Sequence, residues 1–427
     1  MTKPKIIISN GFNKFHLSIA GSEIDKRNNL YMYITGFYPF IYIENIFNLL
    51  NLQSPKILRF KSRKAKIDPT KIKSLFMSEL LWFFGQWLQR KKIKVLSKIF
   101  IKSSLILYGI CSSFYIYKLK SNEIGIFHCR SGFGFLAINK AKKCGWTVIS
   151  DHSMAAPHIY EQLINSNGNL DLCNKNIKSK DILLNHINYD LENSSFILAN
   201  SDFCKDTLIY QGFDSKKIRV IYLGLDEEFI NYVNDIKKHI HKNNYSMCFV
   251  GRFTKEKGAL TIIEAINKLI KSNSFNLKLT IIGEIDKDMF DSHPNFFDNK
   301  NVETTGVIGR EAISKILLST QIFVFPSQSE GSARVIYEAM ACGCFIITTP
   351  NAGSVVRDKE SGFVIPPNNS TKLYEAIENC FSNIDIDNVK DKNQKIIFYN
   401  YSNLSYGCNL NNFYEKLVFL SNHKSSK

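Results

Sequence analysis

The chain has 427 residues and carries 55 Lys and Arg against 38 Asp and Glu, which gives a formal net charge of +17. This length is too great for one ordinary domain and fits two domains of about 200 residues, and an apolar content of 44% is ample for two cores. The ten cysteines are scattered, and Cys342 and Cys344 lack the matching partners of a zinc site, so reduced thiols are expected. Strand-like runs alternate with helix-like stretches, which favours an α/β fold with parallel sheets.

The first predicted unit starts close to the N-terminus. Residues 6–8 form a buried strand, Gly11 marks a turn, and residues 17–24 have the apolar spacing of a helix. Met1 is followed almost at once by this strand, so no secretory signal is indicated and a cytoplasmic location is expected.

A strongly basic run follows at 56–102. Its fourteen Lys and Arg residues face only Asp68 and Glu79, and a Leu, Phe and Trp cluster at 75–87 is interleaved with them. This combination fits the surface of an anionic bilayer, with a peripheral position on the inner face of the cell membrane. A solvated helical face beside a core helix is the alternative. No nucleic acid is expected, because the run lacks a recognisable binding module and its aromatics do not alternate as stacking platforms.

The most apolar stretch of the chain is 99–117. It contains Lys102 and several serines, so we expect a buried or interfacial helix here rather than a membrane span.

Two further strands carry polar residues towards their ends. His128 and Arg130 lie in one, and Asp151 and His152 lie in the next. Open α/β sheets bind ligands at the carboxyl ends of their strands, so these residues are candidates for a binding edge. A lone histidine is also often a structural residue. A strand–helix–strand at 194–226 closes the unit, and the polar segment 231–244 indicates a linker.

A buried strand at 247–250 ends in Gly251-Arg252, and a loop with Lys257-Gly258 precedes an apolar-spaced helix beginning near Ala259. Arg252 offers a planar fork to phosphate oxygens, and Lys257 offers a mobile point charge. Two cations at the end of a strand suit a diphosphate.

Two carboxylates, Glu330 and Glu338, are separated by seven residues between apolar strands at 322–326 and 345–349. The sequence predicts a helix over 332–342, capped by Ser329 or Ser332 and ended by Gly343. This places Glu330 at the helix mouth and Glu338 about two turns down. A helix N-terminus at Gly331-Ser332 is suited to a phosphate group. The alternative is an ordinary strand–loop–helix with solvated acids.

In combination, Gly251-Arg252…Lys257-Gly258 and Glu330-x7-Glu338 resemble the motifs of family 4 retaining glycosyltransferases (glycosyltransferase group 1), which have the GT-B architecture of two Rossmann-like domains. The resemblance is firm over 194–367 and looser towards both ends. It implies that Arg252 and Lys257 bind the diphosphate of a nucleotide-sugar donor, that Glu330 contacts sugar hydroxyls, and that Glu338 holds the ribose.

The resemblance also implies donor contacts at Gly251, Gly331 and Ser332. In the family the turn at Gly11 is glycine-rich and lies against the donor diphosphate; only Gly11 remains here, so its contact stays open. The acceptor is expected on the N-terminal half. There His152 resembles a histidine that approaches the donor sugar, with Asp151, His128 and Arg130 on the acceptor side.

The expected reaction needs no metal and no cofactor besides the donor substrate. Arg252, Lys257 and the helix N-terminus can neutralise the leaving diphosphate. Asp286 and Asp288 have the spacing of a metal motif without its context. No carboxylate is placed as a covalent nucleophile, which favours front-side displacement with retention. The acceptor is a glycan or lipid-linked molecule, as in cell-surface polysaccharide synthesis.

Two alternatives stay open: another GT-B enzyme, such as a phosphorylase or sugar epimerase, and a non-catalytic basic protein associated with a membrane.

The predicted organisation is an acceptor-side domain over 1–225, a linker over 226–244 and a nucleotide-sugar domain over 245–400. Residues 401–427 are expected to form a helix and tail packing back on the first domain.

Overall fold

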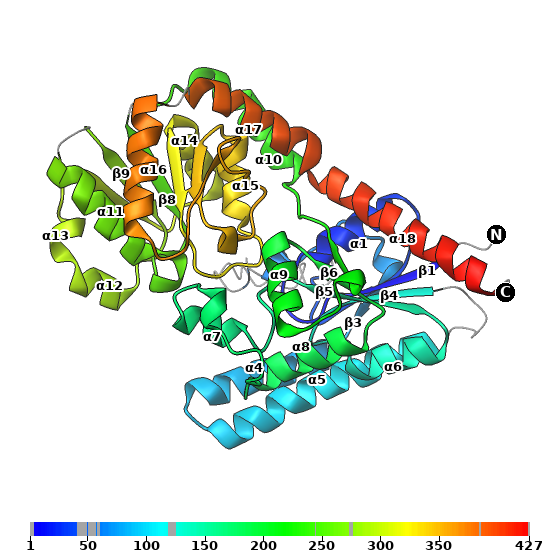
Figure 1. Ribbon diagram of the computed structural model, residues 1–427. Helices are drawn as coiled ribbons and strands as arrows, with labels where there is room; N and C mark the ends of the chain where they lie inside the picture. Colours follow the sequence, from blue (N-terminus) through cyan, green and yellow to red (C-terminus); the bar gives the residue numbers. More distant parts are fainter. Residues whose placement is uncertain are drawn as a thin grey trace.

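The computed structural model describes residues 4–40, 49, 57, 60–117, 125–243, 245–272, 276–383 and 386–425. The chain forms two α/β lobes, each built around a parallel sheet (Figure 1). The expected GT-B architecture of two Rossmann-like domains is confirmed.

The sheet of the first domain has seven parallel strands in the order β3-β2-β1-β4-β5-β6-β7. The strands are β1 (Lys5–Ser9), β2 (Leu30–Thr35), β3 (Ile72–Ser74), β4 (Gly125–Arg130), β5 (Thr147–His152), β6 (Phe196–Ala199) and β7 (Ile218–Val220). The helices are α1 (Leu17–Lys26), α4 (Phe76–Arg90), α5 (Lys94–Tyr117), α6 (Phe135–Lys143), α7 (Tyr160–Asn165), α8 (Ile182–Asn193) and α9 (Asp202–Gln211).

Strand β1 shows why both faces of this sheet must be covered. Side chains alternate across a strand, so Ile6 and Ile8 enter the core beneath α1 while Ile7 enters the opposite core with α5 and α6. An uninterrupted Ile run therefore marks a strand that is buried on both sides.

The sheet of the second domain has six parallel strands in the order β10-β9-β8-β11-β12-β13. These are β8 (Ser246–Val250), β9 (Lys278–Ile282), β10 (Val302–Gly306), β11 (Ile322–Phe325), β12 (Phe345–Thr348) and β13 (Gly362–Val364). Its helices are α10 (Glu227–Ile236), α11 (Ala259–Ser272), α12 (Lys287–Ser292), α13 (Pro294–Phe297), α14 (Arg310–Ser319), α15 (Arg334–Ala341), α16 (Ser370–Asn383) and α17 (Ile386–Asn400).

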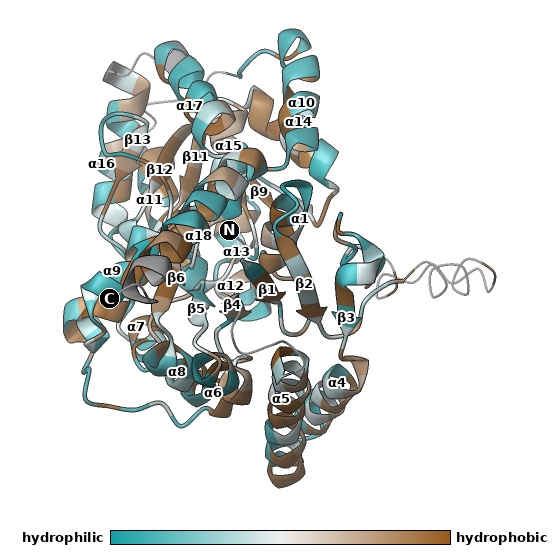
Figure 2. Cartoon of the chain, turned by 90° about the vertical axis from the view of Figure 1, so that its right-hand side faces the viewer, coloured by the Kyte–Doolittle hydropathy of each residue, from teal (hydrophilic) through white to brown (hydrophobic). Residues whose placement is uncertain are grey.

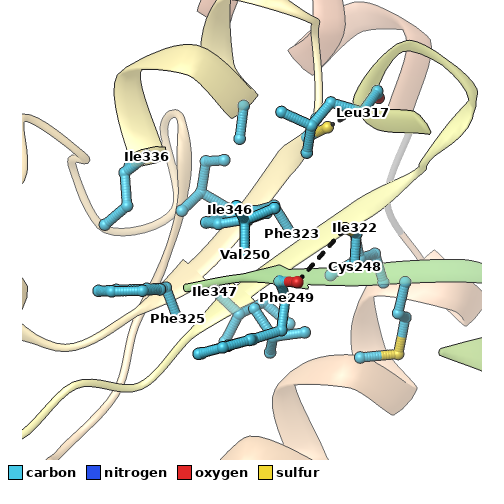
Figure 3. Packing of buried hydrophobic residues seen from close by; sticks show 14 of the residues in the cluster. Cys248, Phe249, Val250, Leu317, Ile322, Phe323, Phe325, Ile336, Ile346 and Ile347 are labelled. Atoms are coloured by element: carbon cyan, nitrogen blue, oxygen red, sulfur yellow. Dashed lines mark hydrogen bonds between the residues drawn. The ribbon is translucent and has the colours of Figure 1, made fainter. Parts of the chain in front are cut away.

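The core of the second domain is dense with aromatic and β-branched side chains. Phe249 of β8 stacks on Phe325 of β11 with ring centroids 5.6 Å apart, and Ile346 and Ile347 of β12 continue this packing (Figure 3). These central strands are fully buried, so the loops at their carboxyl ends start from fixed positions.

The C-terminal helix α18 (Asn403–Ser425) leaves the second domain and packs on α1 of the first (Figure 1). Asn29 donates to Asn411, and Tyr406, Leu410 and Tyr414 are buried against the first sheet. The expected return of the C-terminal helix to the first domain is confirmed.

The segment predicted as a polar linker, 226–244, is partly helical. Helix α10 buries Phe229, Ile230 and Val233 in the core of the second domain. These apolar residues form one short face among charged residues. The sequence therefore showed no helical spacing of apolar residues in this segment. The domain boundaries themselves stay predictions.

Candidate functional site

Loops at the carboxyl ends of both sheets meet between the domains. Ser201, after β6, donates to the carbonyl of Gly331, after β11, at 2.5 Å. Asn351, after β12, donates to the carbonyl of Gly168 at 2.7 Å. A Cβ on Gly331 would lie 1.8 Å from the Ser153 carbonyl oxygen, so only glycine permits this approach. Ser201 also caps α9 by accepting from the Cys204 N–H, so one side chain both caps a helix and joins the two domains.

Lys257 and Glu330 form an ion pair, with Nζ and Oε1 2.5 Å apart. Their loops are held together because the backbone N–H of Gln328 donates to the carbonyl of Glu256 at 2.8 Å. Gly258 adopts φ +83°, and a Cβ there would lie 2.3 Å from the Pro326 carbonyl oxygen. The Lys257-Gly258 dipeptide thus brings the ammonium onto the end of β11, where the diphosphate was predicted.

Arg252 lies at the end of β8, after Gly251 at φ +142°, and is exposed. Its guanidinium lines a cavity of about 650 Å³ between the domains, with Ile164 and Asn165 of the first domain and Gln328 of the second. Within the described ranges no carboxylate forms an ion pair with Arg252, which leaves its fork available to phosphate oxygens.

Tyr160 of α7 faces the same charges from the first domain. Burial, with Glu256 and Glu330 nearby, raises the pKa of its hydroxyl. The structure therefore places Arg252 on the interdomain cavity, and the Lys257–Glu330 pair lies next to Glu256, which also lines it.

Glu338 lies apart from these three and is held by Arg310. The Arg310 Nη2 lies 2.8 Å from Oε1 of Glu338, and its Nη1 lies 2.7 Å from Oδ2 of Asp226. Arg310 is the first residue of helix α14, which follows strand β10.

The predicted caps of the helix between the two glutamates are wrong. Helix α15 begins at Arg334, its N-cap Ala333 makes no side-chain cap, and the Ser332 hydroxyl lies 3.3 Å from that of Tyr337. The reason is that the loop must first reach Ser153 and Ser201 across the domain interface. Only four residues of helix separate Arg334 from Glu338, a rise of about 6 Å, and Gly331 and Ser332 lie in the preceding loop. Gly343 (φ +73°) follows the last turn as predicted.

A second interdomain cavity, of about 400 Å³, adjoins the Arg310 cluster. Its lining includes Lys14 of the first domain with Asp226, Arg310 and Arg334 of the second. Partial burial and the guanidinium groups of Arg334 and Arg310 lower the pKa of the Lys14 ammonium. A concentration of positive charge thus bridges the domains near Glu338.

His152 ends β5, as predicted, but its ring is fully buried. Its Nδ1 lies 3.1 Å from the Ser131 hydroxyl and its Nε2 lies 3.3 Å from the Ala155 carbonyl oxygen. Burial lowers the pKa of His152 to about 4, so the ring is neutral at physiological pH. Both nitrogens have partners inside the first domain, and the predicted donor-sugar contact stays a prediction.

Asp151 lies at the centre of a network that spans the first domain. Its Oδ1 lies 2.7 Å from Nε2 of His16, and its Oδ2 lies 3.2 Å from Nε2 of His128, whose Nδ1 meets the Tyr414 hydroxyl at 2.6 Å. Burial opposes ionisation of Asp151, but the two histidines outweigh it and hold the pKa of the carboxyl well below its ordinary value. His128 lies two residues inside β4 rather than at its end, because pairing with β5 continues to Arg130.

Arg130 and Gly11 shape the loop between β1 and α1. The Arg130 guanidinium stacks over Phe15 at 4.1 Å and donates to the Phe12 carbonyl at 3.0 Å. The Gly11 N–H donates to the Tyr108 hydroxyl, and a Cβ on Gly11 would lie 2.7 Å from the Phe133 ring. Both residues hold the loop in place, while the predicted substrate contacts of both stay untested.

Four residues that the structure brings to the site were not identified from the sequence: Lys14, His16, Arg310 and Arg334. His16 immediately precedes α1, and its partner Asp151 lies 135 residues away in the sequence. No local pattern marks such a pair. The one feature of the sequence that could have drawn attention to this region is Lys14, three positions after Gly11.

The basic run 56–102 divides into two parts. In its first part, Arg63 pairs with Glu79, Lys66 with Glu228 and Lys71 with Asp25. Lys56 and Arg59 lie outside the described residues. Among the described parts of the chain, α5 alone is long and apolar enough to cross a membrane, and 33% of its most apolar stretch is buried within the protein.

In the described ranges, no three His, Cys, Asp or Glu side chains gather as metal ligands would. Asp286 instead caps α12 by accepting from the Met289 N–H at 3.3 Å.

Two parallel α/β domains with facing loops define a GT-B protein, and several solved structures share this fold. HepE of Anabaena, in complex with UDP, superposes with a TM-score of 0.62 at 12% identity over 96% of this chain and all of that chain. The lipopolysaccharide outer core galactosyltransferase WaaB superposes with a TM-score of 0.61 at 14% identity, over 96% of this chain and 99% of that one.

Residues 233–400 match the family model of the glycosyl transferases group 1. The capsular polysaccharide biosynthesis glycosyltransferase CapM of Staphylococcus aureus is 28% identical over 194 residues, 43% of this chain and 51% of that protein. An Escherichia coli UDP-Gal:alpha-D-GlcNAc-diphosphoundecaprenol alpha-1,3-galactosyltransferase is 28% identical over 174 residues, 38% of this chain and 45% of that protein. The chain thus spans about half the length of the curated relatives it matches. Residues 233–400 thus belong to the glycosyl transferases group 1 (family 4), as the sequence motifs predicted.

Proposed function

We propose that the protein transfers a hexose from a UDP-sugar, with retention and without a metal, to a glycan or lipid-linked acceptor in cell-surface polysaccharide synthesis. The observation that supports this most directly is that Arg252 lines an interdomain cavity together with Glu256, next to which Lys257 pairs with Glu330. Two cations and one carboxylate at the end of a strand suit a sugar diphosphate.

Lys257 pairs with Glu330. A donor diphosphate offers Lys257 a more highly charged partner, which frees the Glu330 carboxylate to accept hydrogen bonds from sugar hydroxyls. The Arg252 guanidinium binds other oxygen atoms of the same diphosphate. As the bond to the sugar breaks, charge grows on the leaving phosphate, and both cations stabilise it more strongly in the transition state than in the ground state.

Glu338 is assigned to the ribose. Its carboxylate is already held by Arg310, so the hydroxyls of a nucleotide meet an oriented group. UDP is the proposed nucleotide because HepE was solved with UDP and one relative is named for UDP-galactose. The named lipid-diphosphate acceptor of that relative supports the proposed acceptor class.

On the first domain, His16 is the group we assign to orienting the acceptor hydroxyl. Asp151 fixes its ring just before α1, two positions after Lys14, which lines the second interdomain cavity. The contacts between Ser201 and Gly331 and between Asn351 and Gly168 keep the domains together. Such closure limits hydrolysis of the donor by water.

The test is a thermal-shift screen of the full chain with UDP, GDP and ADP, followed by assays with the sugars of the nucleotide that binds. Ligand at 100 times its Kd adds about 2.7 kcal/mol to the apparent free energy of unfolding, so UDP should raise Tm clearly while GDP and ADP do so less. If none of the three shifts Tm, the proposed donor class is wrong.

Donor turnover measured with and without inorganic phosphate separates the alternatives. A phosphorylase needs phosphate as co-substrate, and an epimerase converts the donor sugar with no acceptor. A transferase releases UDP slowly until an acceptor is added, and activity that survives EDTA supports the metal-free assignment.

A further inference from the structure

Helices α4 and α5 form an antiparallel hairpin that projects from the first domain (Figures 1 and 2). Its contact face combines small residues with larger ones such as Trp82 and Leu88. Gly85, Ser97 and Ser104 are buried, and a Cβ on Gly85 would lie 3.1 Å from the Ile101 backbone nitrogen. Close backbone approach through small residues is typical of helix pairs in membranes.

Large apolar side chains of the hairpin point outward instead. Six of them, each 44 to 74% exposed, are Leu80, Phe84, Trp87, Val95, Leu96 and Ile99. Phe84 stacks on Trp87 with ring centroids 5.6 Å apart. A surface helix of a protein in water normally turns such residues to the core. In this hairpin the large apolar side chains face outward instead, so this surface is suited to contact with an apolar partner.

The same part of the hairpin is strongly cationic. Six positive residues surround its tip and no acidic residue occurs between Leu80 and Tyr117: Arg90, Lys91, Lys92, Lys94, Lys98 and Lys102. None of the six forms an ion pair with a carboxylate within the described ranges, in contrast to Arg63, Lys66 and Lys71 nearer the start of the basic run.

The other end of the hairpin is fixed to the core beneath the loop between β1 and α1. The Tyr108 hydroxyl bonds to Ser9 and to the Gly11 N–H, both at 3.0 Å, and Phe12 packs against Trp82 and Tyr108. Leu105, Tyr108 and Ile116 are buried, so α5 cannot cross a bilayer without unpacking this domain.

We propose that the tip of the α4–α5 hairpin, residues 80–102, docks the protein onto the surface of an anionic lipid bilayer. The Trp, Phe and Leu side chains enter the interface, and the surrounding Lys and Arg meet the lipid headgroups. A second copy of the chain is a poor occupant, because a face-to-face contact would bring two sets of six cations together.

The proposal has a consequence for the reaction that rests on the proposed function. Because Tyr108 and Phe12 connect the hairpin rigidly to the acceptor-side loop, docking holds the interdomain site at a fixed distance from the membrane. The acceptor class that this favours is one held in the bilayer by a lipid.

The experiment is co-sedimentation of the full chain with vesicles of phosphatidylcholine alone or mixed with phosphatidylglycerol, over a range of NaCl. A charge variant (Lys91→Glu, Lys94→Glu, Lys98→Glu) and an apolar variant (Trp87→Ser, Val95→Ser, Leu96→Ser) are compared with matched controls. The controls are Lys142→Glu, Lys143→Glu, Lys217→Glu for charge and Leu172→Ser, Ile177→Ser for apolar surface, all exposed on the first domain.

The unaltered chain should bind the anionic vesicles, and added salt should release it. The charge variant should lose at least about 100-fold in partitioning, since each cation near the surface contributes roughly fivefold. The apolar variant should bind more weakly at every salt concentration, and the controls should bind as the unaltered chain does.

The proposal is overturned if the unaltered chain ignores anionic vesicles at low salt, or if the control variants lose as much binding as the hairpin variants. It is also overturned if the hairpin variants instead dissociate a dimer and leave vesicle binding intact. UDP affinity of each variant, measured by calorimetry, reports on the second domain alone. Unchanged UDP affinity with lost vesicle binding supports the hairpin assignment, and absent UDP binding in every variant would count against the proposed function and not against the docking surface.

Discussion

The charged side chains of the two domains differ in how deeply they are buried. In the second domain, the pairs Lys257–Glu330 and Arg310–Glu338 have side chains 17 to 41% exposed, so a ligand can enter and exchange partners with them. In the first domain, Asp151 and Glu79 have side chains 2% exposed or less. These buried carboxylates accept hydrogen bonds from fixed neighbours and hold loops in place.

This difference indicates a division of work. Charge that remains near solvent can bind and release a diphosphate, whereas a buried and fully paired carboxylate is costly to disturb. Changes to the exposed ion pairs of the second domain should therefore affect activity with little effect on stability. Changes to buried groups of the first domain that do not contact His16 should do the reverse. Four experiments can break or sharpen this contrast.

The largest expected effect is on catalysis in the second domain. Arg252→Ala and Lys257→Ala should each lower kcat/KM for the donor about 100- to 1000-fold, because each removes a cation that stabilises the leaving diphosphate. Thermal unfolding should change little. Lys271→Ala, on the exposed last turn of α11, is the matched control. Unchanged rates in both site variants would refute the assigned roles.

The first domain should respond most strongly to acid. His152 has a pKa of about 4 in the folded chain against about 6.5 when unfolded, so between these values the unfolded state binds the extra proton. Its contribution to the free energy of unfolding is complete above pH 6.5, and about 3 kcal/mol of it is lost as the pH falls to 4.

Urea unfolding of His152→Gln across this range measures that loss. The variant should be less stable at pH 7 and should show a shallower fall in stability with pH, while the exposed His239→Gln should follow the unaltered chain. An identical slope in His152→Gln would mean that another group carries the pH dependence.

A smaller effect is expected for the ribose contact. Glu338→Gln keeps the shape of the side chain and removes its charge, which should raise KM for the donor about tenfold or more, since a hydrogen bond to a charged group contributes about 1.5–3 kcal/mol. Glu303→Gln is the control; Glu303 lies on β10 and forms an exposed pair with Lys278 of β9. If KM is unchanged, Glu338 serves only to anchor Arg310.

The same contrast explains what the sequence could predict. Arg252 and Lys257 lie five positions apart in one strand–loop–helix, and the two glutamates fall within one motif, so their spacing was visible. The parallel sheets, β8 to α11 and the return of α18 were likewise predictable from apolar runs and glycines.

Other features depend on partners far apart in the chain. His16 meets Asp151 across 135 positions, and Lys14 meets Arg310 only because the domains pack together. The first turn of α15 was placed too early because interdomain contacts at Gly331, and not a serine cap, decide where the helix begins. Local patterns hold no information about such contacts.

The smallest predicted effect tests whether the buried hydrogen bonds of the first domain influence donor binding in the second. Tyr414 on α18 contributes one hydroxyl, 2.6 Å from Nδ1 of His128, which in turn meets Asp151. Tyr414→Phe should lower the free energy of unfolding by about 1 kcal/mol, the net value of a typical buried hydrogen bond, and leave KM for the donor unchanged. Tyr399→Phe, exposed at the end of α17, should do neither. A change in donor KM on removing the Tyr414 hydroxyl would mean that the buried network of the first domain is coupled to the exchangeable charges of the second, and the proposed division of work between them would be wrong.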